Sequence, residues 1–192
     1  MTLEKLRLVN GVYTGVFDTG ETFRARETYV EAAGAAPPEA GKVLDDDESA
    51  ALRFAAACSS AEDAALKLIS RSEQCTAGLS AKLLRRGHSR RSLAPVVAAL
   101  QDTGVLDDER YARLWLGARL TRKAESPRVL YGRLLAKGIA SPTARKVLKA
   151  LLTPETELAL LDRYLGRAGD AAATRAALRA EGFSTSVLDE FF

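Results

Sequence analysis

The amino-acid sequence predicts a mainly α-helical fold of tandem three-helix repeats, three units that form an elongated curved body, with a small N-terminal β-hairpin or sheet. Two observations predict it. Helix start and stop signals recur at even intervals from Asp45 onward, and the segment before them is rich in turns and alternating apolar residues. With 192 residues, 47% of them hydrophobic and 28% charged, the chain can build a core, which excludes the disordered and low-complexity classes.

Residues 3–30 are expected to form β-structure. Asn10-Gly11 and Asp18-Thr19-Gly20 are turn sequences, because glycine adopts positive φ angles at little cost and Asn or Asp caps its own backbone. A hairpin of this size has to pack against another element to be stable. Residues 1–44, which include Pro37-Pro38, are assigned to a β-containing extension and linker. We expect an accessory module whose deletion leaves the helical body folded.

Capping residues and glycines mark the helix boundaries that follow, because they satisfy the unpaired backbone groups at helix ends. Ser60, Ser89 and Asp107 each precede a helical stretch. Gly169 and Asp170 are expected to end one helix and to cap the next. Three further starts combine a cap with proline in the first turn: Ser126-Pro127, Ser141-Pro142 and Thr153-Pro154.

A repeat emerges from this spacing, because three segments align on their glycines. They are Leu83–His88, Leu134–Ile139 and Leu178–Phe183, and each lies between two predicted helices. The alignment predicts a connecting helix over 45–59 and three-helix repeats over 60–106, 107–152 and 153–192. Such repeats bury their apolar faces by stacking on their neighbours. The alternative is a single irregular helical domain in which the glycines coincide by chance.

Several classes of site are disfavoured by composition. Cys58 and Cys75 are too few for a disulfide framework and are expected to be small core residues in a reducing cytoplasm. A single histidine, His88, disfavours hydrolase triads and histidine-based metal sites. No signal peptide or membrane span is evident in the sequence. We therefore expect a cytoplasmic protein that is not an enzyme and that needs neither cofactor nor metal.

The helix that begins near Asp107 carries aromatic residues with helical spacing. Tyr111, Leu114, Trp115 and Ala118 follow the i, i+3, i+4, i+7 pattern, which predicts a stripe facing the core. An exposed platform for stacking nucleic-acid bases is the less favoured interpretation.

Charge is distributed unevenly along the chain. The net charge is +3, but residues 1–78 carry 8 Lys and Arg against 13 Asp and Glu, whereas residues 82–149 carry 16 against 5. A field of that sign favours a polyanion, either nucleic acid or an acidic protein groove. The alternative is an Arg-rich helical surface that is merely solvated.

The candidate binding residues are the basic clusters at the helix corners of this window. Arginine predominates, which suits planar recognition of phosphate or carboxylate. Recurrence at successive corners predicts one continuous stripe of basic side chains, made of Arg85, Arg86, Arg90, Arg91, Arg119, Arg122, Lys123, Arg128, Arg133, Lys137, Arg145, Lys146 and Lys149.

The order of four motifs resembles that of the RecX family, bacterial regulators of the RecA recombinase. The resemblance spans about residues 45–192, and its most specific piece is the Leu-Asp-Asp-x-x-Tyr-Ala string. The motifs are Ala65–Arg71, Leu79–Gly87, Gly104–Ala112 and Leu134–Ile139.

The resemblance implies a non-enzymatic regulator that binds the groove of the RecA–DNA filament. It also implies inhibition of the recombinase, ATPase and coprotease activities, which places the protein in homologous recombination, DNA repair and the SOS response. The implied partners are the RecA filament and, weakly, single- or double-stranded DNA, with the protein acting as a monomer. The alternative is a helical DNA-binding protein that acts without RecA.

Overall fold

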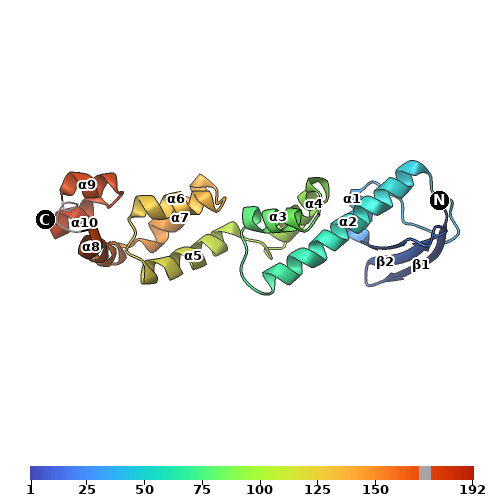
Figure 1. The fold of residues 1–192 in the computed structure, drawn as a ribbon, viewed down its shortest axis with the longest axis horizontal. Coiled ribbons are helices and arrows are strands. Elements are labelled where there is room, and N and C mark those ends of the chain that lie inside the picture. Colours follow the sequence, from blue (N-terminus) through green and yellow to red (C-terminus); the bar gives the residue numbers. More distant parts are fainter. Residues whose placement is uncertain (169–173) are drawn as a thin grey trace. The chain divides into compact units, whose positions relative to one another are not determined.

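The computed structural model describes residues 1–168 and 174–192, so Gly169 and Asp170 lie outside the described residues. The chain forms two compact units, one of Met1–Glu73 with Leu79–Leu106 and the other of Gln74–Gly78 with Asp107–Phe192. A three-stranded sheet comes first along the chain and helices follow, as Figure 1 shows.

The elements of the first unit are β1 (Leu3–Val9), β2 (Val12–Phe17), β3 (Thr22–Arg26), α1 (Glu27–Ala32), α2 (Asp46–Ile69), most of α3 (Thr76–Arg85) and α4 (Arg90–Asp102). The second unit contains α5 (Asp108–Arg122), α6 (Pro127–Ala136), α7 (Ser141–Leu151), α8 (Pro154–Ala168), α9 (Arg175–Ala180) and α10 (Thr185–Phe191).

The sheet has the antiparallel order β1-β2-β3. Its first turn is the predicted Asn10-Gly11, with φ angles of +50° and +69°, which fit the twist of a tight hairpin. On the inner face, the ring of Phe23 covers Gly15, where a Cβ atom would come within 2.4 Å of it. The Phe17 and Phe23 rings stack at 5.0 Å.

The inner face of the sheet packs in the same hydrophobic cluster as α2, α3 and α4. Backbone and charge contacts fasten β3 to α2, because the Arg26 amide donates to Ser59 Oγ at 2.8 Å and the Arg26 guanidinium pairs with Glu62 at 2.6 Å. The sheet therefore belongs to the core of the first unit, in contrast to the predicted accessory module, and deletion of residues 1–44 tests that prediction. A three-stranded sheet cannot bury its own apolar face, and here α2 covers it.

Helix α2 begins at a complete capping box, in which Asp45 and Glu48 bond each other's backbone amides. The helix then continues through Ser60 to Ile69, so the predicted helix start at Ser60 is wrong. The surrounding sequence is rich in alanine, a strong helix former. The neighbouring Ser59 hydroxyl donates to the Ala55 carbonyl within the helix, so serine at this place is compatible with an uninterrupted helix.

The three aligned glycines end α3, α6 and α9 in the same way. Gly87, Gly138 and Gly182 have φ angles of +89°, +83° and +92°. In each corner the amide of the next residue donates to a carbonyl five residues earlier, as from His88 to Leu83 at 3.2 Å. This is the Schellman closure that a left-handed glycine permits. The predicted mainly helical fold of three-helix repeats with a small N-terminal sheet is confirmed.

Most predicted caps are confirmed as well, since Ser89, Asp107, Ser126 and Thr153 each accept a hydrogen bond from the first turn of the following helix. Helix α7 differs from the prediction, because Ala140 is its N-cap and the Ser141 hydroxyl bonds Tyr131 Oη at 2.9 Å instead. The repeat boundaries at 60–106, 107–152 and 153–192 stay a prediction, as does the elongated curved body.

Candidate binding surface

The predicted basic residues divide between the two units. The α3–α4 corner of the first unit carries Arg85, Arg86, Arg90 and Arg91, and the second unit carries the others. Each group is therefore described in its own unit. Within the residues that the structure describes, no three His, Cys, Asp or Glu side chains are grouped as metal ligands, and no helix is long and apolar enough to cross a membrane.

The α3–α4 corner presents three arginines directly to solvent. Arg85, Arg86 and Arg90 are exposed, and their side chains make no ion pair with any residue in 1–168 or 174–192. Arg91 differs, because its guanidinium lies 4.9 Å from the centre of the Phe54 ring. Gly87 and the Ser89 cap fix the backbone between these arginines. The corner is a local excess of positive charge on an ordered turn.

In the second unit, Arg119 and Arg133 converge on a buried carboxylate. Arg119 donates two hydrogen bonds to Glu125, and Arg133 Nη2 lies 3.1 Å from Glu125 Oε1. Glu125 is only 8% exposed, and the hydrogen bonds from Arg119 hold the pKa of its carboxyl below the ordinary value. These two arginines therefore fix the segment between α5 and α6.

A second internal pair holds α7 against α5. Lys146 Nζ lies 2.7 Å from Glu109 Oε2, and Arg113 bonds the other oxygen of the same carboxylate. Hydrogen bonds from Lys146 and Arg113 lower the pKa of Glu109. The charge of Lys146 is thus partly compensated inside the unit.

The aromatic residues of α5 lie at the edge of the core, contrary to the predicted core stripe. The buried residues of this helix are Ala112, Leu116 and Leu120, whereas Leu114 is 58% exposed and Ala118 is also exposed. The predicted stripe is displaced by one position, which is a rotation of about 100° around a helix of 3.6 residues per turn. Two overlapping apolar stripes are compatible with the sequence of α5. The buried one consists of the small and aliphatic side chains of Ala112, Leu116 and Leu120.

Tyr111 and Trp115 are consequently half-buried and face cations. Lys137 Nζ lies 5.9 Å from the Tyr111 ring centre and 5.2 Å from the Trp115 ring centre. The Arg119 guanidinium is 5.8 Å from Trp115. Such cation–π contacts anchor the charged groups beside the rings. The face therefore joins aromatic and positively charged groups, with the exposed Leu114 on the same helix.

A hollow of about 450 Å³ between α6, α7 and the α9–α10 corner collects three more predicted residues, Arg128, Arg145 and Lys149. Its apolar lining comes from Pro127, Leu148 and Leu152. Tyr131 also lines it, with its ring 5.9 Å from the Arg145 guanidinium. Tyr131 was not among the candidate residues predicted from the sequence. Its position one helical turn after Arg128 is the feature that could have indicated that it lines the same surface.

The thirteen predicted residues thus fall into three groups. Three are paired with carboxylates, namely Arg119, Arg133 and Lys146. Three others lie beside aromatic rings and make no ion pair with a described residue, namely Arg91, Lys137 and Arg145. Seven have exposed side chains without an ion pair in the described part of the chain: Arg85, Arg86, Arg90, Arg122, Lys123, Arg128 and Lys149. These seven can attract an anionic partner without first breaking an internal contact.

Comparisons with known proteins agree with this architecture. The family model for "RecX, second three-helix domain" matches residues 107–148. The regulatory protein RecX of Treponema pallidum (strain Nichols) is 33% identical over 147 residues, which cover 74% of this chain and 90% of that protein. The regulatory protein RecX of Halorhodospira halophila is 35% identical over 94 residues, covering 49% of this chain and 58% of that protein.

Solved structures share the fold. A crystal structure of regulatory protein RecX matches with a TM-score of 0.69 at 21% identity, covering 98% of this chain and 97% of that one. The crystal structure of RecX from Lactobacillus salivarius gives a TM-score of 0.55 at 20% identity, covering 70% of this chain and 93% of that one. Given 33% identity across 90% of a curated relative, the chain belongs to the RecX family of regulatory proteins.

Proposed function

We propose that the chain binds the RecA filament on DNA, along its groove, and lowers the recombinase, ATPase and coprotease activities without catalysing a reaction itself. The observation that supports this most is the set of seven exposed, unpaired cations, carried by both units of a RecX-family chain. A protein groove lined by carboxylates, or the phosphates of the bound DNA, would complement such a surface.

The two kinds of basic residue have different parts in this proposal. The seven unpaired cations contact the filament, whereas the carboxylate-paired Arg119, Arg133 and Lys146 hold the second unit in shape. Tyr131 and Trp115 supply contact area next to the charges, and tyrosine, tryptophan and arginine are the residue types that dominate binding energy at interfaces. Substitution within each group therefore has a different consequence.

The test is binding of fluorescently labelled protein to RecA filaments assembled on single-stranded DNA. We expect Arg128→Glu/Lys149→Glu to weaken binding at least tenfold, about 1.4 kcal/mol, because both residues line one hollow and lack internal partners. The matched control is Arg167→Glu/Arg179→Glu, which makes the same charge change at exposed positions of α8 and α9 in the same unit. Equal affinity of both variants and the wild type would contradict the assignment.

The alternative is a DNA-binding protein that acts without RecA, supported by the same unpaired cations. Direct binding to DNA falls steeply with salt and needs no recombinase. A regulator of the filament acts at amounts well below one molecule per DNA site. The two are separated by measuring whether the effect on strand exchange persists at a salt concentration that abolishes binding to naked DNA.

A further inference from the structure

The outer face of the N-terminal sheet is basic, although residues 1–78 are acidic overall. The strand register places Arg7, Thr14 and Arg24 side by side across the three strands. Lys5 lies two residues from Arg7 on β1, about 7 Å away on the same face. All four side chains are exposed, whereas the intervening residues Gly15 and Phe23 belong to the buried face.

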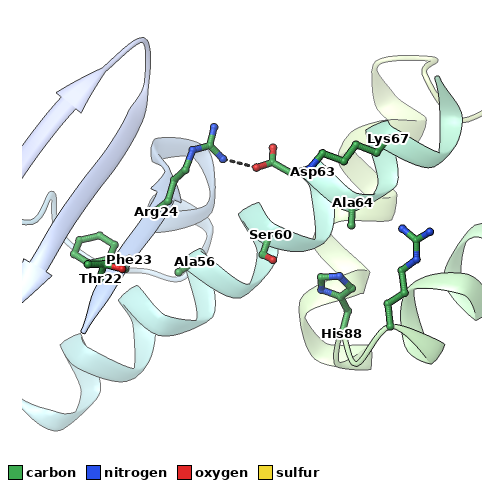
Figure 2. A pocket seen from close by; sticks show the side chains of 10 residues that line it. Thr22, Phe23, Arg24, Ala56, Ser60, Asp63, Ala64, Lys67 and His88 are labelled. Atoms are coloured by element: carbon green, nitrogen blue, oxygen red, sulfur yellow. Dashed lines mark hydrogen bonds and ion pairs between the residues drawn. The ribbon is translucent and has the colours of Figure 1, made fainter. Parts of the chain in front are cut away.

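Two hollows of the first unit adjoin at this sheet. One, of about 570 Å³, is lined by Lys5 and Arg7, and the other, of about 520 Å³, by Lys67 and Arg86. They share Thr22, Phe23 and Arg24, so both hollows border β3. Figure 2 shows the second hollow, in which β3, α2 and the turn that carries His88 face one another.

The charge along this path is not compensated. Lys5, Arg7, Lys67 and Arg86 are exposed and make no ion pair with any described residue. The single acidic residue among the described lining residues is Asp63, and it already bonds Arg24 and Arg26. Four free cations thus follow one another over β1, α2 and the end of α3, and Arg86 also belongs to the α3–α4 corner.

From this arrangement we propose that the first unit binds a nucleic-acid strand by its phosphate backbone, along a track from Lys5 and Arg7 past Lys67 to Arg86. A polymer with evenly spaced charges fits cations that are spread over two adjoining hollows. The exposed hydroxyls of Thr22 and Ser60 lie on the same track and can donate hydrogen bonds to phosphate oxygens. An acidic peptide is less suited, because the described cations are distributed along the track and not focused around one apolar pocket.

The experiment uses the full chain without any recombinase, so its outcome is independent of the proposed filament binding. Fluorescence anisotropy with labelled oligothymidylate measures the affinity of wild type, Lys5→Glu/Arg7→Glu and Arg7→Lys. We expect the double reversal to lower affinity at least tenfold and to reduce the salt slope by about 1 or more, since each neutralised phosphate of a single strand contributes about 0.7. Arg7→Lys keeps the charge and should bind within about twofold of wild type.

The matched control is Arg71→Glu against Arg7→Glu, because Arg71 is an exposed arginine of the same unit that lines neither hollow. Circular dichroism verifies that the variants fold. An equal loss of affinity in Arg71→Glu and Arg7→Glu, or unchanged affinity in both, would contradict the proposed track. So would a loss of binding to polyglutamate with unchanged binding to oligothymidylate, because the occupant would then be an acidic protein segment.

Discussion

Glu125 shows how a buried carboxylate gives basic side chains a structural role. It receives two hydrogen bonds from Arg119 and lies 3.1 Å from Arg133, and it is almost fully buried. Removing one partner of such a group leaves the others desolvated and unpaired. Arg119 and Arg133 were predicted as binding residues from their charge alone, and their partner became evident only when the α5–α6 segment was seen folded.

The first prediction concerns this residue. Glu125→Gln should lower the free energy of unfolding by about 1.5–3 kcal/mol, the range for hydrogen bonds to charged groups. Because the folded pKa of Glu125 is lowered, its contribution is fully present above the ordinary carboxyl pKa and is lost as pH falls through the folded value. Urea denaturation at neutral and acidic pH measures both effects, and the variant should show the smaller acid loss.

Glu190→Gln is the matched control, since Glu190 is exposed on α10 in the same unit. It should leave the free energy of unfolding within about 0.5 kcal/mol of wild type. Identical denaturation curves for Glu125→Gln and Glu190→Gln would show that the buried cluster adds no stability.

At the scale of single elements, the glycine corners give a matched pair of tests. Gly87 and Gly138 both have positive φ angles, but a Cβ atom on Gly87 meets no atom within 4 Å, whereas one on Gly138 would lie 2.3 Å from Ala77 Cβ. Gly87→Ala should therefore cost only the left-handed strain, about 1–2 kcal/mol. Gly138→Ala should cost clearly more, because the first turn of α3 has to move as well.

Thermal denaturation of the two variants measures the difference. Gly138→Ala should have the lower melting temperature, by at least about 4 °C if the extra cost is about 1 kcal/mol or more in a unit of this size. Equal melting temperatures would mean that the contact between Gly138 and Ala77 imposes no constraint.

The N-terminal sheet offers a second test at this scale. Deleting residues 1–44 removes the strands that cover α2, so the first unit should become unstable. Cys58 reports this directly, because it is fully buried in this unit and burial raises the pKa of its thiol to about 11. In a Cys75→Ala background, we expect slow reaction with a thiol reagent in the full-length chain and rapid reaction after the deletion. Slow reaction in both would support the interpretation of the sheet as an accessory module.

The sequence predicted the elements better than their packing, and the reasons are physical. Capping residues and left-handed glycines act locally, so Ser89, Asp107 and Gly138 identified helix ends correctly. Ser60 was wrongly predicted to begin a helix, because the local sequence does not distinguish a serine inside an alanine-rich helix from a capping serine. The buried face of α5 depends on contacts with distant helices, and two apolar stripes one residue apart fit the sequence equally well.

For the whole molecule, charge predicted from the sequence where cations gather, and the binding role of these residues stays a prediction. The window 82–149 does carry the exposed cations of the corner and of the α6–α7 hollow. Internal pairing removes Arg119, Arg133 and Lys146 from the freely available set, and such pairing depends on folding. The basic face of the sheet was not predicted, because the net charge of the surrounding sequence is negative and hides the local contribution of Lys5 and Arg7.

The proposed function depends on regulation of RecA through the unpaired cations. The most direct measurement is the ATPase activity of RecA on single-stranded DNA, titrated with wild-type protein and with Arg85→Glu/Arg86→Glu/Arg90→Glu. We expect the wild-type protein to lower the ATPase rate at amounts well below one molecule per RecA protomer. The triple variant, verified as folded by circular dichroism, should need a several-fold higher concentration for the same effect. An unchanged ATPase rate with the wild-type protein on a cognate filament, at every salt concentration, would contradict the proposed function.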